Sequence, residues 1–222
     1  MTTDIAASEA FIRQDMEGLA ADSRLFRQAY EAGLSYVVTL RAPGFASLIK
    51  IILEQQISLA AAARMYTNLC AACEPLEPAS FLKLDDRLLK ECGFSRQKMV
   101  YARGLAEALL EGSLDLDEVG RLPDEQAIER LCRLKGIGPW SAQNYLLWSH
   151  GRRDIFPSND LALMIGWQWL AGLDKRPSIT ELDEQALAWR PRRTAAAFLI
   201  WHYYLATRAA GTKAVATQSP PN

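Results

Sequence analysis

The residues with the clearest chemical potential form a short glycine turn at residues 135–138, Lys-Gly-Ile-Gly, followed at once by Pro139. Gly136 and Gly138 flank one apolar residue, so the backbone can take left-handed turns and approach another surface closely. Pro139 stands where a helix accepts proline best, at its first position. The turn therefore predicts a helix N-terminus whose amides suit a phosphate oxygen, with Ile137 anchored in the core. For Gly-x-Gly alone, an ordinary corner between helices is the more frequent meaning.

An isolated acidic residue, Asp160, follows Trp140 by twenty residues, in the segment Phe156-Pro157-Ser158-Asn159-Asp160. A further helix is expected to begin there, and an Asp at a helix start acts by default as an N-cap. A carboxylate can also stabilise developing positive charge, or orient and deprotonate an attacking water. The residue types alone leave both roles open.

Several segments stand in a fixed order around the turn and Asp160. They are residues 51–58 (Ile-Ile-Leu-Glu-Gln-Gln-Ile-Ser), residues 93–98 (Gly-Phe-Ser-Arg-Gln-Lys), residues 134–142, and Trp189-Arg190-Pro191. This set closely resembles the helix-hairpin-helix (HhH-GPD) DNA glycosylases of base-excision repair, and within them the 3-methyladenine DNA glycosylase II branch. The resemblance covers roughly residues 35 to 208.

The resemblance implies an all-α fold of two helical lobes, with the hairpin and Asp160 on the walls of an active-site cleft between them. One lobe is expected to combine residues 1–44 with 155–214, and the other to hold residues 45–154, including the hairpin at 134–140. Residues 215–222 are expected to form a flexible tail.

Asp160 is the catalytic carboxylate that the resemblance implies. Cleavage of a C1′–N bond leaves positive charge on the sugar, which a nearby carboxylate stabilises. Bifunctional relatives carry, at the position of Trp140, a lysine that attacks C1′ through a Schiff base. Because this chain has Trp140 there, we expect a monofunctional enzyme in which water is the nucleophile.

The expected substrates are alkylated purines, 3-methyladenine and 7-methylguanine. These bases carry a formal positive charge, which an aromatic face attracts by about 0.5–2 kcal/mol. Trp140 is expected to line the base pocket, joined by Tyr145 and Trp189, although core packing is the common role for such residues. Asn144, Leu161 and Arg192 stand where aromatic residues are expected in this branch, which leaves the substrate range open.

Damaged double-stranded DNA is the expected partner, and an enzyme of this type must flip the base out of the stack. The resemblance places Gln56 at the position of the residue that fills the gap, although Gln55 and Gln56 could simply cap a helix junction. The other expected DNA contacts are Gly136, Ile137, Gly138 and Ser141. The resemblance also implies a monovalent cation, Na⁺ or K⁺, on the backbone carbonyls of Cys132, Leu134 and Ile137.

The composition is that of a globular chain: 222 residues, 50% hydrophobic, with a net charge of −1. Overall charge therefore gives no case for nucleic acid, but two stretches lack acids, residues 92–106 and the chain from Gln185 onward. Seven acidic residues crowd residues 111–129. Such segregation favours basic strips on a binding face, and solvated helix faces explain each cluster equally well.

Four cysteines, Cys70, Cys73, Cys92 and Cys132, form no metal-ligand spacing, and Cys70 and Cys73 are expected to be buried thiols. No cysteine follows Cys132, so the iron–sulfur loop of the endonuclease III branch is not expected. The absence of a long apolar run predicts an intracellular, cytoplasmic protein, nucleoid-associated through DNA, without a membrane span. We expect a monomer that needs no protein partner.

Three other functions remain open from the residues. A glycosylase for deaminated bases such as uracil or hypoxanthine would need more hydrogen bonding to the base than these pocket residues offer. A non-catalytic DNA-binding module would have no need of Asp160, and a helical scaffold would leave the basic stretches and the glycine turn without a purpose.

The predicted helices run through most of the chain: residues 8–21, 22–32 with Asp22 as N-cap and Gly33 as terminator, 45–57, 59–70 capped by Ser58, 85–92, 96–110 capped by Ser95, 124–134, 139–149, 161–170 and 192–207. Residues 177–183 are predicted to be irregular, and residues 209–222 to be a frayed tail.

Overall fold

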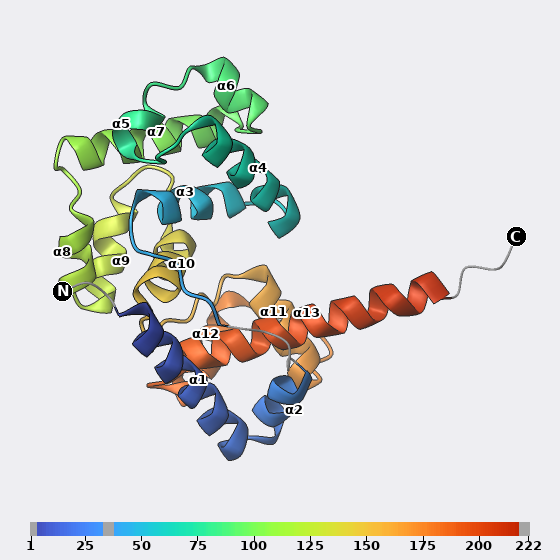
Figure 1. The fold of residues 1–222 in the computed structure, drawn as a ribbon. Coiled ribbons are helices and arrows are strands. Elements are labelled where there is room, and N and C mark those ends of the chain that lie inside the picture. The colour runs from blue at the N-terminus through green and yellow to red at the C-terminus, as the bar shows by residue number, and fades with distance from the viewer. Residues whose placement is uncertain (1–3, 33–37, 218–222) are drawn as a thin grey trace, which may run out of the picture. The chain divides into compact units, whose positions relative to one another are not determined.

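The structure, a computed structural model of the chain, describes residues 4–32 and 38–217, with side chains up to residue 210. Within these ranges the chain forms thirteen α-helices and one short 3-10 helix and no strand (Figure 1). The predicted all-α class is therefore confirmed. The chain divides into two compact units, one at Leu40–His150 and the other made of Asp4–Thr39 and the chain from Gly151 onward. The sequence placed these boundaries near residues 44 and 154.

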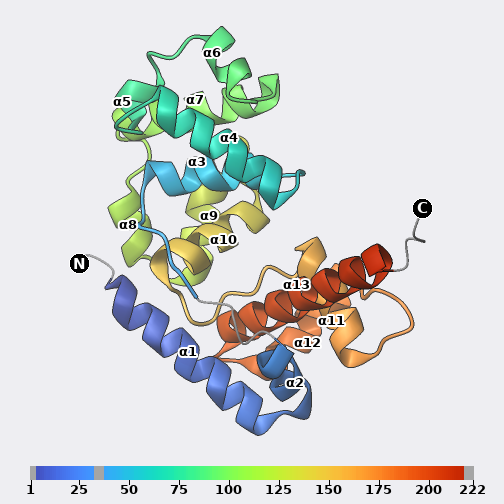
Figure 2. The same cartoon turned by 45° about the vertical axis from the view of Figure 1, so that its right-hand side comes forward.

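The first unit contains eight described helices and includes the glycine turn. They are α3 (Phe45–Glu54), α4 (Leu59–Ala72), α5 (Pro78–Phe81), α6 (Asp86–Glu91), α7 (Arg96–Leu110), α8 (Leu116–Arg121), α9 (Asp124–Cys132) and α10 (Pro139–His150). Helix α3 is central, because it packs against α4, α7 and α10 (Figure 2). Its apolar run leaves Leu48, Ile49, Ile51, Ile52 and Leu53 without exposed surface. A helix that is apolar around most of its circumference must be buried on several sides.

Helix α3 ends three residues earlier than the sequence predicted, at Glu54 and not at Ile57. Ser58 has an extended backbone and caps α4, since its Oγ accepts the amide of Ala61 at 3.2 Å. Between the helices, Gln55 is extended and Gln56 has a φ of 58°. The chain must therefore turn at these two glutamines.

The second unit contains Asp160 and is built around its last helix. Its helices are α1 (Ile5–Asp22), α2 (Arg24–Ala32), α11 (Leu161–Ala171), α12 (Ile179–Ala186), the 3-10 helix η1 (Leu187–Trp189) and α13 (Arg193–Thr217). Helix α13 packs against α1, α2 and α11. Gly166 on α11 permits this approach, because a Cβ there would lie 2.8 Å from the side chain of Ile200.

Three local predictions in the second unit are wrong. Asp22 is the last residue of α1 and not an N-cap, and its carboxylate accepts a hydrogen bond from Arg192 at 2.8 Å. Residues 177–183 are not irregular, because Ser178 and Glu181 form a capping box that opens α12. Helix α13 continues to Thr217, ten residues beyond its predicted end, and leaves no frayed tail at residues 209–217. The predicted terminator Gly33 lies outside the described residues.

Other local predictions are confirmed. Ser95 and Ser58 cap their helices with side-chain oxygens, and Asp160 caps α11. All four cysteines are free thiols; Cys73 is buried as predicted, whereas Cys70 is only partly buried. Within the described ranges, none of the helices has the length and apolar character needed to cross a membrane.

Candidate nucleic-acid interface and catalytic carboxylate

The glycine turn follows α9 directly and is closed by its own backbone. The amide of Leu134 donates to the carbonyl of Leu131, and the amide of Ile137 donates to the carbonyl of Leu134, both at 3.1 Å. The side chain of Ile137 is 4% exposed, so it anchors the turn in the core as predicted. The turn is thus a fixed platform and not a free loop.

The two glycines of the turn have different structural needs. Gly136 has a φ of 94°, and a Cβ added there would lie 2.1 Å from Cγ of Tyr101 on α7. Gly138 has open space where its Cβ would be. Neither amide donates to a backbone carbonyl within the described part of the chain. Both N–H groups lie just before the N-terminus of α10, where the expected phosphate contact would be made.

Ser141, an expected DNA contact, has its side chain turned inward. It is 2% exposed, and its Oγ accepts a hydrogen bond from Nε2 of Gln55 at 2.9 Å. The same Nε2 donates to the carbonyl of Gly136 at 2.9 Å. Gln55, which the sequence gave no separate role, therefore ties the α3–α4 junction to both arms of the turn.

Gln56, the residue expected to enter the DNA, is exposed between α3 and α4. Among the described residues it is the one non-glycine residue with positive φ, at 58°. A left-handed backbone at a residue other than glycine costs free energy and persists where the surrounding structure holds it. The structure therefore keeps Gln56 exposed at a turn between two helices.

Helix α10 carries two of the residues expected in the base pocket. Trp140, in the first turn, is partly exposed. Tyr145 is fully buried within the first unit, where its hydroxyl accepts the amide of Gly44 at 3.1 Å. Burial raises the pKa of this hydroxyl. Asn144 is also buried and donates to the carbonyl of Trp140 at 2.8 Å. The side chain of Trp140 therefore has exposed surface that could contact a base, whereas that of Tyr145 has none.

Asp160 is held at the start of α11 by two donors. Its Oδ1 accepts the amide of Leu163 and the indole Nε1 of Trp201, both at 3.0 Å. Trp201 lies on α13, forty-one residues along the chain. The sequence analysis gave Trp201 no role at the site, because no local signal marks its contact with Asp160. The carboxylate is thus fixed in one orientation at a positive helix end.

Trp189 and Leu161 lie in the second unit. Trp189 is 6% exposed and packs against Phe26, Phe156 and Trp167, with ring centroids 4.9–5.4 Å apart. Leu161, next to Asp160, is 55% exposed. Trp189 thus belongs to an aromatic core, and Leu161 has a free apolar surface.

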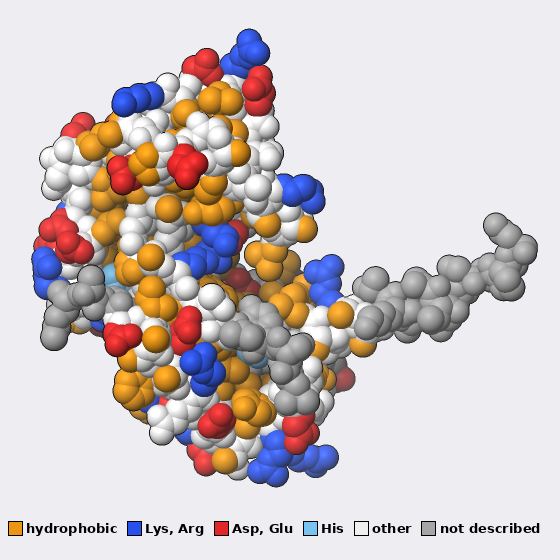
Figure 3. All heavy atoms as spheres, viewed as in Figure 1, with side chains coloured by type: hydrophobic (Ala, Val, Ile, Leu, Met, Phe, Trp, Pro, Cys, Tyr) orange, Lys and Arg blue, Asp and Glu red, His pale blue; other side chains and the backbone are white. Residues whose placement is uncertain are grey.

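The arginines and lysine of the two predicted basic strips are largely occupied by partners within the protein. Arg192 pairs with Asp22 at 2.8 Å, and Arg193 pairs with Asp154 at 2.8 Å. Lys98 is buried and donates to the carbonyl of Leu53. On the face drawn in Figure 3, basic and acidic side chains are interspersed. The predicted separation of charge is therefore not what the structure shows there.

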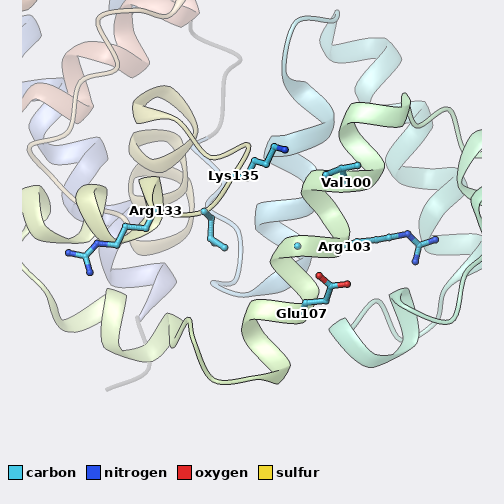
Figure 4. Close-up of a pocket in the computed structure, with 7 residues that line it drawn as sticks. Val100, Arg103, Glu107, Arg133 and Lys135 are labelled. Atoms are coloured by element: carbon cyan, nitrogen blue, oxygen red, sulfur yellow. The ribbon is translucent and has the colours of Figure 1, made fainter.

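A cavity of about 410 Å³ lies beside the turn in the first unit. Val100, Arg103 and Glu107 of α7 line one side, and Arg133, at the end of α9, and Lys135, in the turn, line the other (Figure 4). Lys135 is exposed, as expected for a residue that faces solvent or phosphate.

The expected cation ligands are backbone carbonyls of the turn. The Leu134 carbonyl already accepts the amide of Ile137, whereas those of Cys132 and Ile137 accept no backbone hydrogen bond in the described residues. Uncharged oxygen atoms are suitable ligands for a hard cation, so these carbonyls have the chemistry that a monovalent cation such as Na⁺ or K⁺ would need. No cluster of three or more His, Cys, Asp or Glu side chains that could hold a metal occurs in the part of the chain described.

The fold and these sites define a class of protein. Residues 49–191 match the HhH-GPD superfamily of base excision DNA repair proteins, and the chain belongs to this family. It is a DNA glycosylase of base-excision repair, in the 3-methyladenine glycosylase branch, as the sequence predicted.

One related sequence and two solved structures illustrate this relationship. The chain is 30% identical to DNA-3-methyladenine glycosylase 1 of Schizosaccharomyces pombe over 161 residues, which is 71% of each chain. The structure of a 3-methyladenine DNA glycosylase of S. pombe in complex with abasic DNA superimposes with a TM-score of 0.79 at 26% identity, covering 85% of this chain and 95% of that one. A DNA-3-methyladenine glycosidase of Bacillus halodurans gives a TM-score of 0.69 at 30% identity, covering 96% and 93%.

Proposed function

We propose that the protein is a monofunctional glycosylase that releases alkylated purines, 3-methyladenine and 7-methylguanine, from duplex DNA. The observation that carries the proposal is Asp160, a carboxylate fixed at a helix N-terminus by the Leu163 amide and the Trp201 indole. Similar proteins named as 3-methyladenine glycosylases support the substrate class.

Asp160 would act on the charge that develops as the glycosidic bond breaks. The departing base takes the bonding electrons, and the sugar becomes an oxocarbenium-like cation. An oriented carboxylate stabilises that cation and accepts a proton from the water that attacks C1′. The Trp201 hydrogen bond favours one carboxylate orientation before substrate arrives, which avoids reorganisation during the reaction.

Trp140 supports both the monofunctional mechanism and the substrate class. An indole cannot form a Schiff base with C1′, so no covalent intermediate is expected at this position. A positively charged alkylpurine is attracted to an aromatic face. We retain Trp140 as a pocket wall and leave out Tyr145, whose ring is fully buried.

The turn would hold the DNA backbone through the amides of Gly136 and Gly138, while Gln56 fills the gap left by the flipped base. A monovalent cation on the carbonyls of Cys132, Leu134 and Ile137 would add positive charge toward the phosphate. We propose that the protein acts as a monomer on DNA, without a protein partner.

The test is incubation of the purified protein with methylated duplex DNA, with released bases separated by chromatography and strand nicking scored before and after alkali. We expect 3-methyladenine and 7-methylguanine to be released and nicking to appear only after alkali. Borohydride should trap no covalent adduct.

Two results would contradict the proposal. A borohydride-trapped adduct, or nicking without alkali, would show lyase activity. Release of uracil or hypoxanthine in place of alkylated purines would assign the deaminated-base alternative. Trp169→Phe, a change on an exposed tryptophan, serves as the control for Trp140→Phe, which we expect to weaken release of charged bases only.

A further inference from the structure

Two adjacent glutamines at the α3–α4 junction have different surroundings. The exposed side chain of Gln56 follows a left-handed backbone, whereas Gln55 is partly buried and donates to the carbonyl of Gly136 and to Oγ of Ser141. Both protons of one amide group are thereby committed to the two arms of the glycine turn. Gln55 is the direct covalent neighbour of Gln56, so any shift of the turn is transmitted to Gln56.

Two further contacts fix the elements on either side of this bridge. The buried amine of Lys98 donates to the carbonyl of Leu53, one residue before the end of α3. The ring of Tyr101, also on α7, lies directly over Gly136. Helix α7 therefore holds both the end of α3 and the turn, and Gln55 closes the connection between them.

We propose that Gln55 is a positioning residue that sets the spacing between the phosphate-binding turn and Gln56. This inference rests on the proposed function, in which the turn binds a phosphate and Gln56 enters the space of the flipped base. Because that space lies at a fixed distance from the bound phosphate, Gln56 fills it only when both elements are held as one body. Gln55 itself contacts no DNA in this account.

The decisive variants change Gln55 without changing its length. Gln55→Met removes both hydrogen bonds, and Gln55→Glu replaces the donor with oxygens that repel the Gly136 carbonyl. Loss of two such neutral hydrogen bonds is expected to slow single-turnover base release about tenfold, with Glu slower than Met. The dissociation constant for undamaged duplex should stay within about twofold, because the phosphate contacts remain. Gln28→Met, which removes an exposed hydrogen bond to Tyr203, is the matched control.

A double-mutant cycle separates positioning from a general structural role. Gln56→Gly removes the side chain while keeping the left-handed backbone, which glycine tolerates. If Gln55 acts through Gln56, Gln55→Met should have almost no further effect on the rate in the Gln56→Gly background. A structural role would give the same fold-loss in both backgrounds.

The substrate is methylated duplex DNA with 2-aminopurine beside the lesion, whose fluorescence reports unstacking. The inference is supported if wild type releases the base and Gln55→Met releases it slowly, with a smaller change in fluorescence. Equal rates for wild type and Gln55→Met, or additive losses in the cycle, would overturn it. A wild-type protein that binds and unstacks this DNA without releasing a base would instead refute the proposed function, and the fluorescence change would still compare Gln55→Met with wild type.

Discussion

Substitution of Gly136 by alanine should damage the glycine turn in two ways. Its φ of 94° is a strained conformation for alanine, which costs about 1–3 kcal/mol. The new Cβ would lie 2.1 Å from Cγ of Tyr101, and overpacking of this kind costs about 1–3 kcal/mol more. We therefore expect the free energy of unfolding to fall by about 2–6 kcal/mol, a large share of the 5–15 kcal/mol typical of a folded protein.

Gly138→Ala is the matched control, because Gly138 has open space at its Cβ position and no positive φ. Its stability should stay within about 1 kcal/mol of wild type, as for most surface changes. Under the proposed function its DNA affinity should fall, since a methyl group would stand beside the amide proposed to bind the phosphate. Urea unfolding measures the first quantity, and a DNA titration at fixed salt measures the second.

The double variant Tyr101→Ala, Gly136→Ala isolates the two costs. Removal of the Tyr101 ring should restore the free energy of unfolding that overpacking costs, and should leave the loss caused by the strained φ of residue 136. A Gly136→Ala protein as stable as wild type would refute the reasoning, because neither the backbone conformation nor the ring above it would then be as described.

Three further predictions concern single residues. Trp201→Phe removes the indole donor to Asp160 and should lower the single-turnover rate about tenfold with DNA affinity unchanged, as loss of one hydrogen bond predicts. Burial lowers the pKa of His202 to about 4, from 6.5. Between these values the unfolded chain binds a proton that the folded chain does not, so stability should fall by up to about 3 kcal/mol as pH drops from 6.5 to 4. His202→Leu should flatten this dependence in urea titrations; an unchanged slope would contradict it. Ser58→Ala loses the cap on Ala61 and should cost about 1 kcal/mol in the same assay, whereas no loss would argue against the cap.

The sequence predicted the elements that depend on local signals. Ser58, Ser95 and Asp160 cap their helices because a short side-chain oxygen reaches amides two or three residues away, and such contacts can be inferred from the sequence alone. Ser178 and Glu181 form the same kind of local signal, a capping box, so the helix that follows them could also have been predicted from the sequence.

Contacts between distant residues could not be predicted in this way. The basic stretch after Gln185 suggested a binding surface, yet Arg192 and Arg193 pair with Asp22 and Asp154, which only the fold brings near. The hydrogen bond from Trp201 to Asp160 is equally invisible along the chain.

The two glutamines show the same limit within one dipeptide. Gln55 and Gln56 have identical side chains, and no local rule says which of them faces the protein. Their roles differ because α3 ends at Glu54 and the turn offers a carbonyl and a hydroxyl to the first glutamine only. Packing against the turn therefore decides which side chain remains for DNA.

The central claim is that Asp160 is the group on which base release depends. Its most direct test compares wild type with Asp160→Asn, which keeps the side-chain size and an oxygen for the helix cap, in single-turnover release of 7-methylguanine. Asp183→Asn is the control, because it makes the same change at another carboxylate that accepts a hydrogen bond, from the hydroxyl of Ser158. We predict that Asp160→Asn binds DNA with wild-type affinity and releases no base, while the control is active. Near-native release by Asp160→Asn would contradict the account.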